Sequence, residues 1–176
     1  MQRLSGLVDP GRREELGQAL AGRVASLVDQ AGLTPLIVTA DKQVVAWAGG
    51  SGFAVATDPG RGLDAACQVG VSWATDNGYR WMVIHADLPL LVAGDLRALT
   101  RPMARGADVI APSADGGTTA ISSTGRFSFS YGPASFHRHL SRLTDPEVVT
   151  RTGLLHDLDS PNDFLSASRH PAGDWI

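Results

Sequence analysis

The sequence predicts an α/β protein with three layers, in which a mostly parallel sheet carries helices on both of its faces. The first two thirds of the chain alternate short apolar runs with amphipathic stretches, joined by connections of a few residues. This alternation is typical of parallel sheets with crossover helices. The length of 176 residues, with 43% hydrophobic and 19% charged residues, predicts one globular domain over residues 1–176.

The elements of the first two thirds are bounded by typical start and stop residues. Asp9 is expected to cap a first helix that has Pro10 at its first position and stops at Gly32. Gly78 is expected to close a third helix. The expected strands cover 34–40, 53–57, 81–86 and 107–111, and the expected helices cover 10–31, 41–48, 62–77 and 93–104.

The last third has a different residue pattern. Small, polar and apolar residues alternate over 118–123 and 127–131, as they do in half-exposed strands. The sequence then predicts a helix over 133–143 and strands over 147–152 and 154–159. A last helix is expected to open with a capping box at 160–163.

Charge and composition exclude several classes of partner. The net charge of -3 indicates no basic face for nucleic acid. The N-terminus has no apolar core of a signal peptide, and no run approaches the roughly 18 apolar residues of a membrane helix. We therefore expect a cytoplasmic protein with neither nucleic acid nor membrane as partner. Cys67 is the one cysteine, which excludes an internal disulfide, and a homodimer remains open.

The stretch WMVIHADLPLL at 81–91 carries a carboxylate, Asp87, to the end of an apolar strand. Ligands of open parallel sheets bind beyond the carboxyl ends of the strands. Asp87 could there serve as a metal ligand or accept a hydrogen bond from a ligand hydroxyl. Capping of the next turn is the alternative, and the position alone does not decide between them.

Asp157 and Asp159 form a second carboxylate pair. Residues two apart on a strand share a face, and two carboxylates on one face repel unless a cation lies between them. Magnesium is commonly held by one or two carboxylates together with substrate phosphates. The alternative is that Asp159 caps the helix beginning at Pro161, whereas we assign Asp163 to capping.

Glycine-bearing turns offer backbone amides to a ligand. One leads from a strand into a helix at 58–64, and another lies at 116–119. At Gly132, close approach is permitted, Pro133 is expected to start a helix, and Ser135 falls in its first turn, which is a natural anion site. A plain turn or helix start is the alternative in each case.

Taken in order, the segments DPGRGLDAA, HADLPLL, GGTTAIS, SYGPASFHRHL and HDLDSPNDF resemble the CofC/FbiD family. The resemblance extends from about Arg3 to Phe164. Members are guanylyltransferases of the MobA-like nucleotidyltransferase fold and act in coenzyme F-420 biosynthesis. The resemblance implies a GTP-binding, magnesium-dependent transferase that joins GMP to a small phosphorylated acid and releases pyrophosphate. Acceptors known in the family are 2-phospho-L-lactate, phosphoenolpyruvate and 3-phosphoglycerate.

The resemblance also implies roles for particular residues. The family's metal-binding, catalytic aspartates match Asp87, Asp157 and Asp159. Its nucleotide-side turn matches Gly62, Leu63 and Asp64, and its acceptor-binding residues match Thr119, Gly132 and Ser135.

Two departures from the family pattern stand out. The family usually has Asn at the position of Asp64. Its first strand and basic loop, which grip the nucleotide phosphates, are represented here only by Arg3 and Leu4, so Arg3 is expected to contact the nucleotide.

We therefore expect a guanylyltransferase, with phosphoenolpyruvate as the first acceptor to test because the arginine-rich composition suggests an actinobacterial-type source. A phosphate monoester is largely ionised at pH 7, so its attack on GTP requires no general base. One alternative is a non-catalytic nucleotide- or partner-binding relative that has lost the phosphate-binding loop. Another is a molybdopterin nucleotidyltransferase or a sugar transferase, against which the anion site at 132–135 argues.

Overall fold

The computed structural model describes residues 10–176, without the side chains of Pro10, Arg12 and Arg13. The predicted helix cap Asp9 and the predicted nucleotide contact Arg3 lie outside the described residues.

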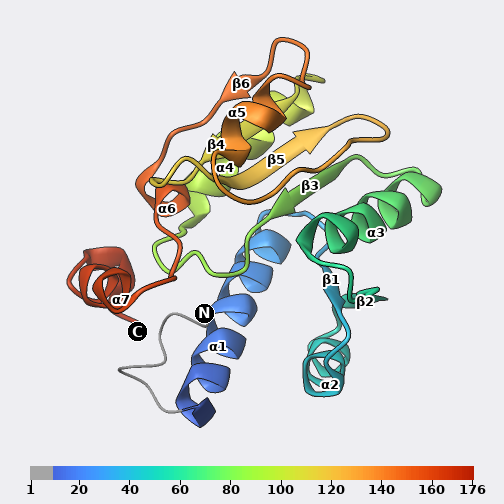
Figure 1. Ribbon diagram of the computed structural model, residues 1–176. Helices are drawn as coiled ribbons and strands as arrows, with labels where there is room; N and C mark the ends of the chain where they lie inside the picture. The colour runs from blue at the N-terminus through green and yellow to red at the C-terminus, as the bar shows by residue number, and fades with distance from the viewer. Residues whose placement is uncertain (1–9) are drawn as a thin grey trace.

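Helices and strands alternate along most of the chain (Figure 1). The order is α1 (Pro10–Gln30), β1 (Leu36–Thr39), α2 (Lys42–Gly50), β2 (Ala54–Thr57), α3 (Leu63–Asp76), β3 (Trp81–Ile84), α4 (Ala93–Ala104), β4 (Val109–Pro112), β5 (Thr118–Ser123), α5 (Ser135–Leu140), β6 (Glu147–Val148), α6 (Thr152–Leu155), α7 (Pro161–Ser168) and the 3-10 turn η2 (Pro171–Gly173). None of the helices in this part of the chain is long and apolar enough to cross a membrane.

The strands form two sheets. Strands β1 and β2 pair in parallel, and the larger sheet has the order β3-β5-β4-β6. Strand β5 runs antiparallel to β3 and β4, whereas β4 and β6 are parallel. Helix α3 packs against both β1 and β3 and so links the two sheets. The predicted α/β class is confirmed, and β5 is the strand that makes the larger sheet mixed.

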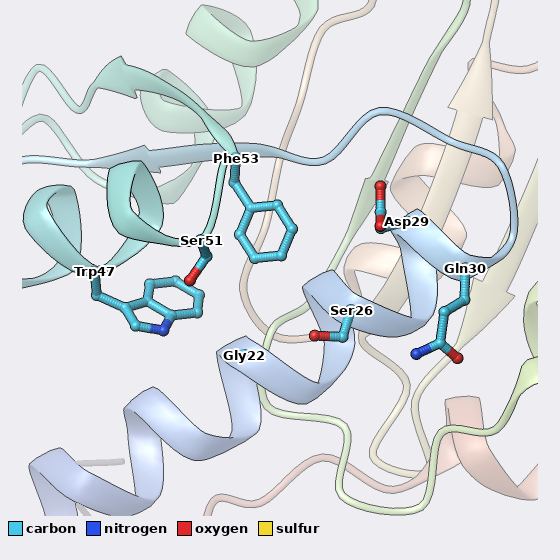
Figure 2. A pocket seen from close by; sticks show the side chains of 7 residues that line it. All are labelled: Gly22, Ser26, Asp29, Gln30, Trp47, Ser51 and Phe53. Carbon is cyan, nitrogen blue, oxygen red and sulfur yellow. The ribbon is translucent and has the colours of Figure 1, made fainter.

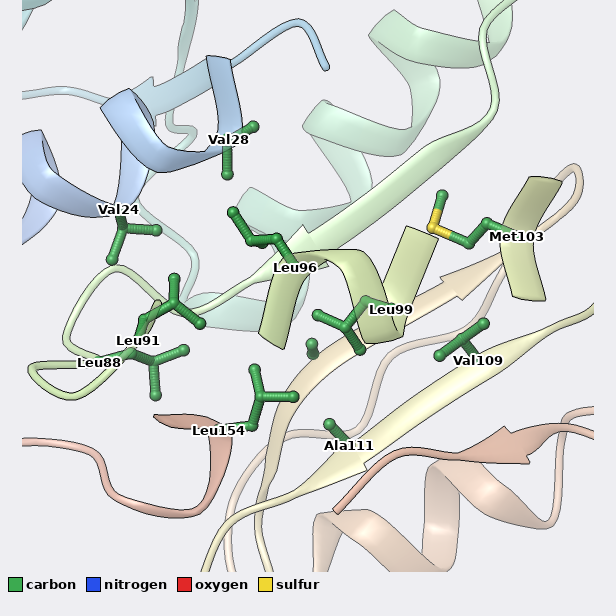
Figure 3. Packing of buried hydrophobic residues seen from close by; sticks show 11 residues of the cluster. Val24, Val28, Leu88, Leu91, Leu96, Leu99, Met103, Val109, Ala111 and Leu154 are labelled. Atoms are coloured by element: carbon green, nitrogen blue, oxygen red, sulfur yellow. The ribbon is translucent and has the colours of Figure 1, made fainter. Parts of the chain in front are cut away.

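Helices cover both faces of the larger sheet because its strand residues alternate between two hydrophobic clusters. On one face, Met82 and Ile84 of β3 pack with residues of α1 and α4. Val24 of α1 and Leu99 of α4 are among the residues of this cluster that Figure 3 shows. On the other face, Trp81 and Val83 of the same strand pack with residues of α3 and with the segment 127–131. This arrangement is the predicted three-layer order.

Two predicted strands of the last third are wrong, and two further elements have other bounds than predicted. Residues 127–131 form no strand, although Phe127 and Phe129 are buried as the alternation predicted. The predicted strand over 154–159 is replaced by the single helical turn α6 followed by irregular chain. The turn forms because Leu154 is buried in the cluster of α1 and α4. The helix predicted from Pro133 begins only at Ser135, and the strand predicted over 147–152 shortens to β6.

Replacing Gly153 by alanine is expected to lower the free energy of unfolding by about 2 kcal/mol, because overpacking forces the backbone to shift. A Cβ atom at Gly153 would overlap the Asp95 carboxylate and lie 2.7 Å from the Leu90 carbonyl oxygen. Gly49→Ala is the matched control, since nothing lies within 4 Å of its Cβ position in α2. Urea denaturation of both variants checks this, and an equal effect of the two would contradict it.

Candidate active site at the carboxyl end of β3

Two segments far apart in sequence meet just beyond β3. Asp87 follows this strand, and its carbonyl oxygen accepts a hydrogen bond of 3.0 Å from the backbone N–H of Leu158. Leu158 is fully buried and packs in a third hydrophobic cluster with Leu20 and Leu90. Its two neighbours, Asp157 and Asp159, are only partly buried. The structure therefore brings the three predicted carboxylate residues to one place, although the strand expected there is absent.

Negative charge accumulates at this place. Burial is the main cause that raises the pKa of Asp157, while a backbone hydrogen bond opposes the shift. The charges of Asp87, Asp115 and Asp159 raise the pKa further. A bound cation would relieve this repulsion, because an opposite charge within a few ångströms favours the ionised form of a carboxyl group.

The carboxylates do not form a ready-made metal cage. No group of three or more His, Cys, Asp or Glu side chains among residues 10–176 is arranged to hold one ion. Magnesium does not need such a cage, since it is usually bound by one or two carboxylates, several waters and substrate phosphates. The clustered carboxylates around Asp157 could therefore supply one or two ligands to a divalent cation whose other ligands come from water or a bound molecule.

Two buried polar atoms at the end of β3, His85 Nε2 and Asp87 Oδ1, have no hydrogen-bond partner within the described residues. The hydroxyl of Tyr131, by contrast, faces the Cys67 thiol. The ring centroids of His85 and Tyr131 are 5.3 Å apart, and His85 Nδ1 lies 3.8 Å from Asp87 Oδ1, beyond hydrogen-bond distance. Proteins rarely leave buried polar atoms unpaired. Their grouping therefore indicates a place where a polar ligand supplies the missing partners.

The predicted nucleotide turn lies beside this group. Gly62 caps α3 with a φ of 88°, a conformation that favours glycine, and Leu63 is 48% exposed. The Asp64 carboxylate accepts a hydrogen bond of 2.7 Å from the backbone N–H of Tyr131. Asp64 thereby ties the nucleotide turn to the segment that leads into Gly132.

The predicted anion site differs from a regular helix start. Ala134 adopts the left-handed conformation with a φ of 56°, so α5 begins two residues later than predicted and has six residues. Gly132 is exposed with a φ of 110°. The guanidinium of Arg138 turns back to donate hydrogen bonds to the carbonyl oxygens of Ser130 and Pro133. The positively charged guanidinium of Arg138 thus lies beside Gly132.

Of the three predicted acceptor residues, Gly132 and Ser135 lie close together, whereas the side chain of Thr119 faces β4. Ser135 is 1% exposed, and its hydroxyl donates a hydrogen bond of 3.3 Å to Thr118 Oγ1. Thr119 is fully buried, and its hydroxyl lies 3.4 Å from the carbonyl oxygens of Ala111 and Pro112 in β4. The hydroxyl that joins Ser135 is therefore that of Thr118, which the sequence reasoning did not single out.

His139 is a second residue that the sequence reasoning missed. It is fully buried, with Nδ1 3.0 Å from Thr118 Oγ1 and Nε2 accepting a hydrogen bond of 2.9 Å from the Ser130 N–H. Burial first, and then the positive charge of Arg142, lowers the pKa of His139 to about 4. The sequence did contain a signal for His139, namely its spacing. Ser135 and His139 are four residues apart and therefore share one face of a helix.

A separate pocket of about 360 Å³ lies between α1 and the end of α2 (Figure 2). Gly22, Ser26, Asp29 and Gln30 line it from α1, and Trp47, Ser51 and Phe53 line it from the opposite side. None of these residues carries the predicted chemistry. The pocket is therefore distinct from the site at the end of β3.

Comparisons with known proteins show the family to which the chain belongs. Residues 1–150 match the family model described as "Guanylyl transferase CofC like". A phosphoenolpyruvate guanylyltransferase of Rubrobacter xylanophilus is 35% identical over 92% of this chain and 84% of its own. A 2-phospho-L-lactate guanylyltransferase of Methanothermobacter thermautotrophicus is 30% identical over 78% of this chain and 63% of its own.

A solved structure shows a similar fold. A putative nucleotide-diphospho-sugar transferase from Desulfovibrio desulfuricans G20 superimposes with a TM-score of 0.73 over 98% of this chain and 85% of its own. Its sequence identity is 15%, so the likeness concerns the fold alone.

Asp64→Ala is expected to increase hydrogen exchange of the Tyr131 amide by about tenfold or more, because a hydrogen bond to a charged acceptor contributes about 1.5–3 kcal/mol. Asp64→Asn keeps an oxygen acceptor and is expected to change the exchange rate by less than about threefold. Amide exchange followed by NMR checks both. Equal exchange in the two variants would contradict the assigned bond.

Proposed function

Because this chain belongs to the CofC-like family of guanylyltransferases, we propose that it transfers GMP from GTP to a small phosphorylated carboxylic acid and releases pyrophosphate. Phosphoenolpyruvate is the proposed acceptor. The relative from Rubrobacter, one of several named for it, is 35% identical, whereas the relative from Methanothermobacter named for 2-phospho-L-lactate is 30% identical. The proposed place of this reaction is coenzyme F-420 biosynthesis.

The observation that carries the proposal is the pair of buried atoms without partners at the end of β3, His85 Nε2 and Asp87 Oδ1. Both residues follow β3, where the two carboxylate segments meet, and the ring of His85 contacts Tyr131, whose N–H is held by Asp64. A nucleotide bound there would meet hydrogen-bond partners for its polar groups and reach the carboxylates with its phosphates. Ligands of α/β sheets characteristically bind at this end of the strands.

Magnesium is the proposed metal, held by Asp87, Asp157 and Asp159. The repulsion that raises the pKa of Asp157 supports this choice, because carboxylates without a cation resist ionisation together. When bound, magnesium would supply neutralisation of the phosphate charge. The chain itself would hold the carboxylates beside the phosphates, because the backbone hydrogen bond from Leu158 to Asp87 joins the two segments that carry them.

The proposed reaction needs alignment rather than a base. An oxygen of the acceptor's phosphate bonds to the α-phosphorus of GTP, and the bond from that phosphorus to the bridging oxygen breaks, so pyrophosphate leaves. The attacking oxygen is already ionised near pH 7. His139 does not serve as a base here, because both of its nitrogens are hydrogen-bonded inside the protein.

The acceptor is proposed to bind at the loop 130–135. Gly132 offers backbone without a side chain, and Arg138 places a positive charge beside it. Ser135 donates its hydroxyl proton to Thr118 Oγ1, which leaves the proton of the Thr118 hydroxyl for an anion. These features suit the carboxylate or phosphate of a small acid and support an anionic acceptor over a neutral one.

The decisive assay measures pyrophosphate release from GTP and magnesium with phosphoenolpyruvate, 2-phospho-L-lactate or 3-phosphoglycerate in separate reactions. Turnover with phosphoenolpyruvate is expected to exceed that with the other two acids. Release with none of the three would refute the proposed function, and a preference for another acid would correct the acceptor.

Asp87→Asn is expected to lower kcat by about a hundredfold or more, because it removes a charge from the proposed metal site. The protein should remain folded, since relief of repulsion around Asp157 compensates the loss. Asp76→Asn is the matched control, as Asp76 is an exposed carboxylate at the end of α3. Similar activity of the two variants would contradict the role of Asp87.

A further inference from the structure

His139 connects three segments of the proposed acceptor site. It projects from α5 into the protein, is fully buried, and contacts the ring of Tyr131 at a centroid distance of 4.8 Å. Its Nδ1 faces Thr118 Oγ1 at the start of β5, and its Nε2 faces the N–H of Ser130. Ser135, one turn earlier on the same helix, bonds to the same Thr118 oxygen.

The partners of His139 determine where its proton lies. A backbone N–H can only donate, so Nε2 must accept the bond from Ser130 through its lone pair. In a neutral imidazole the proton then resides on Nδ1, which donates to Thr118 Oγ1. The two nitrogens therefore have fixed and opposite roles.

This tautomer fixes the hydroxyl groups around it. Thr118 Oγ1 accepts from His139 Nδ1 and from the Ser135 hydroxyl, which occupies both of its lone pairs. The proton of the Thr118 hydroxyl is thereby left to donate to an anionic acceptor, whereas the Ser135 hydroxyl gives its own proton to Thr118. Without the donor at Nδ1, the Thr118 hydroxyl could turn toward residue 139, and Ser135 would lose its fixed orientation.

We propose that His139 is a positioning residue for the acceptor site, which orients the Thr118 and Ser135 hydroxyls through the proton on Nδ1. This inference rests on the proposed function, because it assigns the acid-binding role to the loop that ends at Ser135. The rival role is purely structural, since His139 also packs edge-on against Phe127 and Phe129. The two roles differ in which of the two hydrogen bonds matters for binding of the acceptor.

Two amide substitutions separate these bonds. The amide nitrogen of Asn occupies roughly the position of Nδ1, so His139→Asn keeps a donor for Thr118 and loses the acceptor for Ser130. The amide oxygen of Gln reaches roughly the position of Nε2, so His139→Gln keeps the acceptor for Ser130 and loses the donor for Thr118. His137→Asn is the matched control, because His137 is exposed on the same helix.

The test measures kcat and the KM values for phosphoenolpyruvate and GTP in these variants. His139→Gln is expected to raise the KM for phosphoenolpyruvate about tenfold, equivalent to about 1.4 kcal/mol, whereas His139→Asn raises it less than about threefold. The KM for GTP should stay unchanged in both. Equal effects of Asn and Gln, or a parallel rise in the KM for GTP, would overturn the positioning role.

Thr118→Val keeps the inference testable if the His139 variants fail to fold, because valine matches threonine in shape. It is expected to reproduce the tenfold rise in the KM for phosphoenolpyruvate, and an unchanged KM would overturn the inference. If the wild-type chain releases no pyrophosphate with any acceptor, both the proposed function and this inference are refuted. If the wild-type chain is active but the Asn and Gln variants have the same KM for phosphoenolpyruvate, the inference alone is refuted.

Discussion

The site depends on one backbone hydrogen bond, from the N–H of Leu158 to the carbonyl oxygen of Asp87. It joins the end of β3 to a segment about seventy residues further along the chain. The buried side chain of Leu158 keeps this segment in place by packing with Leu20 and Leu90. The neighbours of Leu158, Asp157 and Asp159, are partly buried and are brought to the end of β3 by the same bond. Hydrophobic packing thus stabilises an arrangement of charges that repel one another.

The other half of the site is held by side-chain hydrogen bonds to backbone and hydroxyl groups. Asp64 binds the N–H of Tyr131, and His139 binds the N–H of Ser130 and the hydroxyl of Thr118. These bonds place the turn before α3 against the loop before α5. The carboxylate half favours a cation, while the loop half offers Arg138 and a hydroxyl. This division suits a reaction in which two phosphate-bearing molecules meet, as we propose.

The sequence could predict elements whose boundaries are marked by local chemistry. Apolar runs gave β1 to β4, and the capping box at Ser160 and Asp163 formed as expected. It could not predict α6, because that turn depends on Leu154 packing against helices far away in sequence. Nor could it choose between Thr118 and Thr119. Strand β5 is buried on both faces, so alternation does not tell which hydroxyl faces α5.

The most direct test of the central claim is the position of the metal. We would soak crystals of the protein with GTP and Mn²⁺ and locate the ion by its anomalous scattering. The account predicts an ion bonded to a carboxylate oxygen of Asp87 and one of Asp157, with the nucleotide phosphates on its open side. An ion that accompanies bound GTP but touches neither aspartate would contradict the account.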